Sequence, residues 1–249
     1  MELINEAYIK KLMTDGTVKE TGVIKVGENH LFTPSAIEYL HDKNIRVERG
    51  SVKSESAPKE YHTVFGGVLM NKPEHMTHLK GDVLVFKDHP IIKYRGALDY
   101  LESKIILAQI VAEKEGYKSV VSDLEEIITL VRKLIRFEIT GEKLNDFTLI
   151  GLNAEQLREH SHHSTKHYGI SHFLPTYKHG EIVANLNGLR TLARKTELVA
   201  YDAFKDENKN VCRDDIIQAL NRLSSVFWIM MCKFIKGLYK RDDGHRQAD

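Results

Sequence analysis

The sequence RTLARKTE at residues 190–197, followed by ALNRLSS at residues 219–225, decides the fold that the chain is predicted to have. Both phrases lie within long segments of helical periodicity. On a period of 3.6 residues, Arg190, Arg194 and Glu197 share one face of the first helix. The second segment carries a wide apolar seam made of Ile216, Leu220, Leu223, Phe227, Met230 and Phe234. Two adjacent helices of this kind predict a helical bundle.

The polar faces of these two helices predict a binding pocket. Asn221 and Arg222 on the second helix would face Arg190 and Arg194 across the helix interface. Guanidinium groups bind phosphate through paired, charge-assisted hydrogen bonds, so the pocket would suit a polyphosphate. The same periodicity also fits a solvated face with i,i+4 ion pairs, and periodicity alone favours that simpler interpretation.

Composition excludes several classes of protein. The 249 residues include 36 Lys and Arg against 35 Asp and Glu, which gives no reason to expect nucleic acid or a membrane surface as partner. The two cysteines, Cys212 and Cys232, exclude a disulfide scaffold and a cysteine-rich zinc site. Charges within residues 1–13 argue against a signal peptide, and no apolar run is long enough to span a bilayer. We therefore expect a cytoplasmic protein.

The pattern of breaks divides the chain into four parts. They are a small α+β arm at 1–50, a linker and loop region at 51–93, a helical bundle at 94–240 and a polar tail at 241–249. Within the arm we expect helices over 1–13 and 35–43 and strands over 23–26 and 45–48. In the bundle we expect helices over 94–114, 120–139, 154–160, 181–205 and 214–239. The fold class is therefore all-α, with a small α+β arm.

A histidine-rich stretch precedes the arginine phrase. It contains His160, His162, His163, His167, His172 and His179. Imidazole suits zinc, iron or copper, but the spacing matches no compact zinc signature. The default interpretation is a polar loop, and a metal site or a loop at the mouth of an active site are the alternatives. Because Walker, dinucleotide-binding and nucleophile-elbow motifs are missing, any chemistry must depend on positioning and electrostatics.

Several phrases together resemble a known family. Residues 87–103, KDHPIIKYRGALDYLES, resemble the lysine-containing phrase of PduO-type ATP:corrinoid adenosyltransferases, and residues 190–197 and 221–224 resemble two further phrases of that family. The chain is still more similar to the ethanolamine-utilisation class, EutT. That likeness rests on TPSA at 33–36, THL at 77–79, the histidine-rich loop at 162–180 and QALNRLSS at 218–225. It covers nearly the whole chain.

The resemblance implies a five-helix bundle whose active sites lie between subunits. The implied reaction transfers the 5′-deoxyadenosyl group of ATP to cob(I)alamin and gives adenosylcobalamin. Reduced cobalt is itself the nucleophile, so the protein must position ATP and neutralise the departing polyphosphate. By resemblance, ATP would be bound by Lys87, Arg190, Arg194, Asn221 and Arg222, with Arg190, Arg194 and Glu197 as the catalytic set. Asp99 would make a polar contact between subunits, and Phe173, Leu174 or Phe137 would face the corrin.

The resemblance also implies partners and cofactors. Mg²⁺ is expected to accompany ATP. Some members of the class carry a histidine followed by clustered cysteines, but after His62 residues 63–72 contain no cysteine, so we expect neither zinc nor iron. The further expectations are a homo-oligomer, a trimer by family analogy or else a dimer, an electron donor such as a flavoprotein, association with a bacterial microcompartment, and a product that serves ethanolamine ammonia-lyase.

Two other functions fit the sequence less well. A helical bundle of this kind would also serve as a non-catalytic interaction module in an ethanolamine or propanediol microcompartment pathway, and absence of ATP binding would favour that function. A metallohydrolase built on the histidine-rich loop is a third possibility, which tightly bound stoichiometric metal would support.

Overall fold

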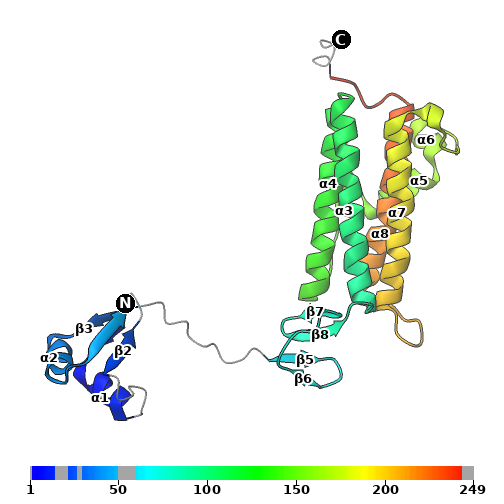
Figure 1. Cartoon of the computed structure of the whole chain (residues 1–249). Coiled ribbons are helices and arrows are strands. Elements are labelled where there is room, and N and C mark those ends of the chain that lie inside the picture. Colours follow the sequence, from blue (N-terminus) through cyan, green and yellow to red (C-terminus); the bar gives the residue numbers. More distant parts are fainter. Residues whose placement is uncertain (1, 15–21, 27–29, 50–59, 243–249) are drawn as a thin grey trace. The chain divides into compact units, whose positions relative to one another are not determined.

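The computed structural model describes residues 2–14, 22–26, 30–49 and 60–242 of the chain (Figure 1). It divides into two compact units, Met1–Glu60 and Tyr61–Asp249. Each unit has a hydrophobic core of its own. In the described residues, no helix combines the length and the apolar character needed to cross a membrane.

The first unit is a small α+β arrangement, as the sequence predicts. Strand β1 (Glu2–Ile4) pairs in parallel with β3 (His30–Phe32), and β2 (Val23–Val26) pairs in parallel with β4 (Arg46–Arg49). Helices α1 (Glu6–Thr14) and α2 (Pro34–Asp42) complete the unit. Thr33 caps α2, because Thr33 Oγ1 accepts a hydrogen bond from Ala36 N at 3.3 Å. Its core consists of Ile4, Ile9, Ile24, Val26, Ala36, Leu40 and Ile45.

Two details of this unit differ from the sequence-based prediction. The expected helix over 1–13 begins only at Glu6, because Glu2–Ile4 forms a strand instead. Strand β3 was not predicted, since three residues are too few to show an alternating pattern. Residues 51–59, at the start of the predicted linker and loop region, lie outside the described residues, as do residues 243–249 of the predicted tail.

The second unit is a helical bundle, which confirms the predicted fold class. Its helices are α3 (Pro90–Lys114), α4 (Lys118–Thr140), α5 (Ala154–His162), α6 (Ser164–Tyr168), α7 (Glu181–Phe204) and α8 (Asp214–Ile235). The long helices run side by side (Figure 1). Helix α8 packs against α4, α5, α6 and α7. Its residues Val226–Cys232 are all buried, so it is the central helix of the unit.

Local sequence explains where several helices begin and end. Gly141 takes a left-handed conformation, with φ of 77°, and ends α4. Asn153 and Gln156 form a reciprocal capping box at the start of α5. Helix α8 ends at Ile235, before the predicted end at 239, and the positive φ of Gly237 lies just beyond it. The histidine-rich loop expected over 162–180 contains α6 and a short 3₁₀ turn at Tyr177–His179.

Residues 61–86, assigned to a loop region from the sequence, instead form a small sheet. Its strands are β5 (Tyr61–Thr63), β6 (Val68–Leu69), β7 (Met76–Lys80) and β8 (Val83–Phe86), in the order β6-β5-β8-β7. A further pair of two-residue strands, β9 (Thr148–Leu149) and β10 (Leu152–Asn153), precedes α5. Strands of two to five residues give little periodic signal, which explains why the sequence did not reveal them.

Arg95 joins this sheet to the helices. From α3 it donates to the carbonyl oxygens of His78 and Leu79 at 3.3 and 2.8 Å, at the irregularity in β7. The same guanidinium pairs with Glu138 of α4 at 2.7 Å. The sheet is therefore held at the end of the bundle where α3 begins and α4 ends (Figure 1).

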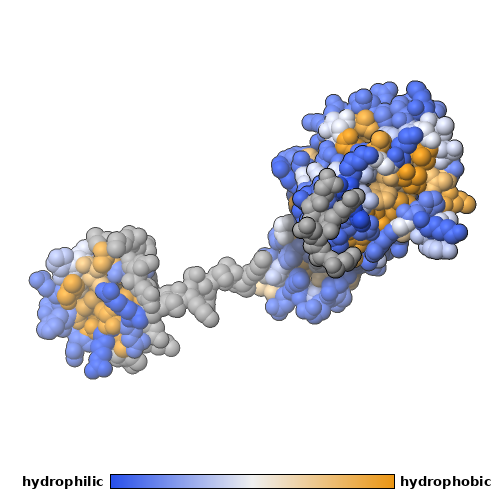
Figure 2. All heavy atoms as spheres, turned by 90° about the horizontal axis from the view of Figure 1, so that it is seen from above, coloured by the Kyte–Doolittle hydropathy of each residue, from blue (hydrophilic) through white to orange (hydrophobic). Residues whose placement is uncertain are grey.

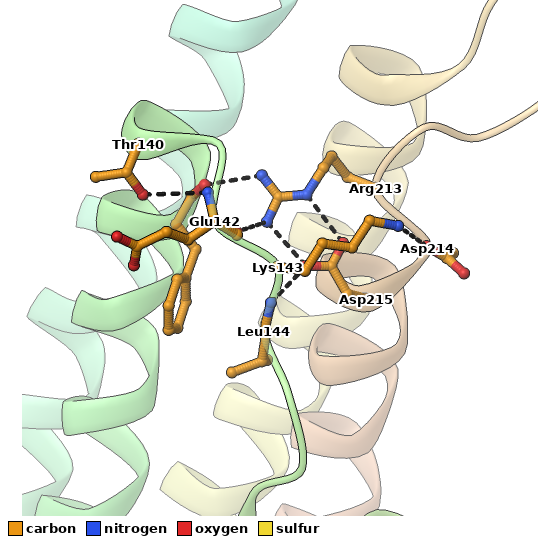
Figure 3. A network of polar contacts seen from close by, with 8 residues as sticks. Thr140, Glu142, Lys143, Leu144, Arg213, Asp214 and Asp215 are labelled. Atoms are coloured by element: carbon orange, nitrogen blue, oxygen red, sulfur yellow. Dashed lines mark hydrogen bonds and ion pairs between the residues drawn. The ribbon is translucent and has the colours of Figure 1, made fainter.

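A second arginine joins α8 to the end of α4. Arg213 forms a paired contact with Asp215 at 2.8 and 2.9 Å and donates to the carbonyl oxygens of Phe137 and Glu142 (Figure 3). Burial alone would raise the pKa of Asp215, but hydrogen bonds from Arg213 and from Leu144 N lower it to about 2. The ion pair is buried, with side chains 11% and 8% exposed.

We predict that Arg213→Ala lowers the free energy of unfolding by about 3 kcal/mol or more, because it leaves a buried carboxylate without its partner. The matched control is Lys143→Ala, which removes the exposed Lys143–Asp214 pair and should cost no more than about 0.5 kcal/mol. Urea unfolding at pH 7 measures both. Equal, small losses in the two variants would contradict the structural role of Arg213.

Candidate functional site

Helices α7 and α8 enclose a polar cavity at the centre of the two phrases that the sequence singles out. Its volume is about 300 Å³. The cavity is lined by Ser161, His162, His172, Arg190, Arg194, Asn221, Ser224, Ser225 and Trp228. The structure therefore brings together Arg190, Arg194 and Asn221, three of the residues expected to bind ATP. The site residues themselves remain proposals.

The two arginines make this cavity cationic. Arg190 is half-buried, and its Nε and one terminal nitrogen both donate to Asn187 Oδ1 at 3.1 Å. Burial, together with the neighbouring charge of Arg194, lowers the pKa of Arg190, but a guanidinium stays charged at neutral pH. No carboxylate is among the described residues that line the cavity. Two uncompensated guanidinium groups in one small cavity favour an anionic ligand.

A hydrogen bond between the helices sets the edge of the cavity. Asn221 Nδ2 donates to Glu197 Oε1 at 3.0 Å, which links the two phrases directly. Glu197 is partly buried but does not line the cavity itself. Its position agrees with a role in orienting Asn221 more than with direct contact to a ligand.

Arg222 faces a different cavity from the one that contains Asn221. Its cavity measures about 480 Å³ and is lined by Asp146, Phe147, Asn153, Ala154, Glu155, Arg158, Gln218 and Arg222. Arg222 is buried, and its Nε has no hydrogen-bond partner in the described residues. Burial lowers the pKa of Arg222, and the nearby Arg158 lowers it further. Successive residues of a helix point about 100° apart, which agrees with Asn221 and Arg222 facing different cavities.

An aromatic stack covers one side of the arginine cavity. The rings of His172 and Phe173 both stack on the ring of Trp228 of α8. Each ring centroid lies 4.9 Å from that of Trp228, with the planes 24° and 25° apart. Phe173 also contacts the ring of His179. Leu174, next in the chain, is 81% exposed. The histidine-rich loop is therefore fixed to the bundle through Trp228 while Leu174 faces solvent.

Lys87 lies far from the arginine cavity within one chain. It precedes α3, whose Tyr94 packs edge-on against Phe204 at the end of α7, with ring centroids 5.1 Å apart. Arg190 and Phe204 are fourteen positions apart on α7, which corresponds to about 21 Å along the helix. One chain therefore does not bring Lys87 to the two arginines.

The remaining predicted residues lie outside the arginine cavity. Asp99 is exposed on α3. Phe137 is partly buried near the end of α4, where it lines a separate groove of about 1010 Å³. His62 of β5 pairs with Asp82 at 3.3 Å.

Sequence reasoning missed one cluster of polar residues. Glu159 and His160 of α5 meet His167 of α6. The histidines were noted in the sequence, but the contribution of Glu159 was not, because helix α6 was not predicted. Burial lowers the pKa of His160, and the nearby His167 lowers it further.

Comparison with known proteins decides the family. The model of the cobalamin adenosyltransferase family matches residues 69–234, which include strands β7 and β8 of the small sheet and all of the long helices except the last residue of α8. The chain belongs to the cobalamin adenosyltransferase family. The matched region contains both arginines of the cavity, Asn221 and Lys87, and it confirms the prediction of an adenosyltransferase that acts on a corrinoid.

Curated relatives extend the likeness beyond this region. The chain is 28% identical to the corrinoid adenosyltransferase EutT of Escherichia coli K12 over 92% of this chain and 91% of that protein. The likeness to the EutT protein of Salmonella typhimurium LT2 has the same extent. No solved structure matches the chain. The predicted resemblance to the EutT class is thereby confirmed.

Proposed function

We propose that the protein transfers the 5′-deoxyadenosyl group of ATP to the cobalt of cob(I)alamin, and that the triphosphate of ATP binds in the cavity between α7 and α8. The observation that carries this proposal is a cavity that contains Arg190 and Arg194 and that no carboxylate of the described residues lines. Membership of the cobalamin adenosyltransferase family supports the reaction.

The reaction makes limited chemical demands on the protein. The cobalt of cob(I)alamin supplies the electron pair, a bond forms between cobalt and C5′ of ATP, and the bond between C5′ and the phosphate oxygen breaks. Negative charge accumulates on the leaving polyphosphate, where Arg190 and Arg194 would stabilise it. Asn221 would hold ATP in place, oriented by its hydrogen bond to Glu197. We propose that Mg²⁺ accompanies the polyphosphate.

Arg222 would help to bind ATP from the second cavity. Its side chain is buried beside Arg158, and its Nε has no hydrogen-bond partner within the described part of the chain, so an anionic group entering this cavity would satisfy it. Asn221 lines one cavity and Arg222, the next residue on α8, lines the other. A bound ATP molecule that spans both cavities would therefore contact both residues.

A complete site requires Lys87 from a second copy of the chain. The separation along α7 supports a second chain, in place of the same chain, as the source of Lys87. Apolar side chains reach the surface of the helical unit (Figure 2), and α3 exposes about half of the side chains of Tyr100, Leu107 and Ile110. We propose that this face of α3, with Asp99 beside it, forms the contact between subunits.

The corrin would bind beside the histidine-rich loop. Leu174 is exposed and Phe173 is fixed on Trp228, so Leu174 is the better placed of the two to press on the lower face of a corrin and displace its axial ligand. Phe137 lies in a separate groove and is the second candidate. Three expectations from the resemblance stay predictions. They are reduction by an electron donor such as a flavoprotein, association with a bacterial microcompartment, and use of the product by ethanolamine ammonia-lyase.

We predict that Arg194→Ala lowers the rate of adenosylcobalamin formation at least about tenfold, since a lost charge-assisted contact is worth roughly 1.5–3 kcal/mol. Arg136→Ala, which removes an exposed arginine of α4 that lines neither of the two arginine-containing cavities, should retain wild-type activity. The visible spectrum of the product measures both. Wild-type turnover in a folded Arg194→Ala variant would contradict the proposal that this face of α7 binds ATP.

Absence of ATP binding to the wild-type protein would favour a non-catalytic interaction module instead.

We also predict that Leu174→Ala reduces the four-coordinate cob(II)alamin signal seen by electron paramagnetic resonance with ATP present, while ATP affinity is retained. Leu198→Ala is the matched control, because Leu198 is also an exposed leucine, on α7. An undiminished signal in the Leu174 variant would move the displacing role to Phe137, and the same measurement on Phe137→Ala would then test it.

A further inference from the structure

His172 lies in the arginine cavity, and the reaction as described so far gives it no role. It belongs to the segment between α6 and α7, and it lines the cavity together with Arg190 and Arg194. Within the described part of the chain, its ring nitrogens make no hydrogen bond or ion pair with the protein. These nitrogens are therefore available to a ligand that enters the cavity.

The packing of α7 on α8 places His172 at the Arg190 end of the cavity. The two helices are antiparallel, because the chain turns back between them (Figure 1). The hydrogen bond from Asn221 to Glu197 sets their register. Arg190 lies seven residues before Glu197, and Trp228 lies seven residues after Asn221, so Arg190 and Trp228 are level. His172 stacks on Trp228 and thus lies beside Arg190.

The ring of His172 is held in place by the protein itself. Its centroid lies 4.9 Å from that of Trp228, a buried side chain of α8. Phe173 stacks on the same indole and has the ring of His179 at 5.3 Å. His179 Nδ1 in turn accepts a hydrogen bond from Thr176 N at 2.9 Å. A ligand that contacts His172 therefore does not have to order this side chain, which favours binding.

Stacking leaves the chemistry of the imidazole intact. It occupies a face of the ring, whereas the nitrogens lie at the edge. A neutral imidazole has one N–H donor and a protonated one has two, and phosphate oxygens accept such hydrogen bonds. The cavity already contains two guanidinium groups, and none of the described residues that line it is a carboxylate. No acidic side chain of the lining competes with a phosphate for the donor.

We propose that His172 is a further binding residue for the triphosphate of ATP, to which it donates a hydrogen bond beside Arg190. This inference rests on the proposed function, which puts the triphosphate in the same cavity. His162, the last residue of α5, also lines the cavity, but no aromatic ring among the described residues fixes its side chain. His172 is the histidine whose ring is prepared for the contact.

Binding of inorganic triphosphate to the full chain, measured by calorimetry, tests the proposal. His172→Phe retains a planar ring for the stack on Trp228 but removes the N–H donor. It should bind triphosphate at least about tenfold more weakly than the wild type, as expected for the loss of a hydrogen bond to a charged group. His163→Phe is the matched control, because His163 is exposed and does not line the cavity. It should bind like the wild type.

Arg194→Ala separates failure of this inference from failure of the proposed function. Weaker binding in Arg194→Ala with wild-type affinity in His172→Phe would overturn the role of His172 and leave the cavity as the triphosphate site. Wild-type affinity in both variants, or no binding of triphosphate to the wild-type protein, would overturn both proposals.

Chemical footprinting of the wild-type protein tests the contact even if His172→Phe does not fold. Diethyl pyrocarbonate modifies accessible imidazoles, and both His172 and His163 are exposed. Triphosphate should slow the modification of His172 severalfold and leave that of His163 unchanged, as read by mass spectrometry of the peptides. Equal modification of His172 with and without saturating triphosphate would overturn the proposal.

Discussion

The burial of α8 is the constraint on which the helical unit depends. Residues Val226–Cys232 are buried without interruption, so neighbouring helices must cover every side of this part of α8. Polar side chains on such a helix cannot reach bulk water easily and need partners inside the protein. Asn221 donates a hydrogen bond to Glu197, whereas Arg222 Nε has no partner among the residues that the structure describes. The candidate binding cavities lie at these positions because a buried helix carries polar groups there.

Periodicity predicted the long helices well because each repeats its apolar pattern over several turns. Thr33, Asn153 and Gly141 are capping residues in the structure, and each lies within a few residues of a helix end expected from the sequence. The short strands of residues 61–86 were missed, since their stability comes from contacts distant in sequence. Arg95, which holds the sheet against α3 and α4, gives no sign of that role in the sequence alone.

The candidate site was predictable only in part. Helical spacing placed Arg190 and Arg194 on one face, and the structure brings Asn221 to the same cavity. Spacing could not show the second cavity that Arg222 faces, because other segments of the chain form most of its lining. Nor could it show the meeting of Glu159, His160 and His167, which depends on an unpredicted reversal of the chain.

The central claim is that a functional site combines Lys87 of one copy of the chain with Arg190 of another. Activity of co-expressed, co-purified Lys87→Ala and Arg190→Ala chains tests it most directly. Each variant alone should be nearly inactive. Mixed oligomers should recover about a quarter of wild-type adenosylation, because random assembly brings an intact Lys87 to an intact Arg190 at about a quarter of the sites. Mixed oligomers that remain as inactive as the separate variants would contradict the claim.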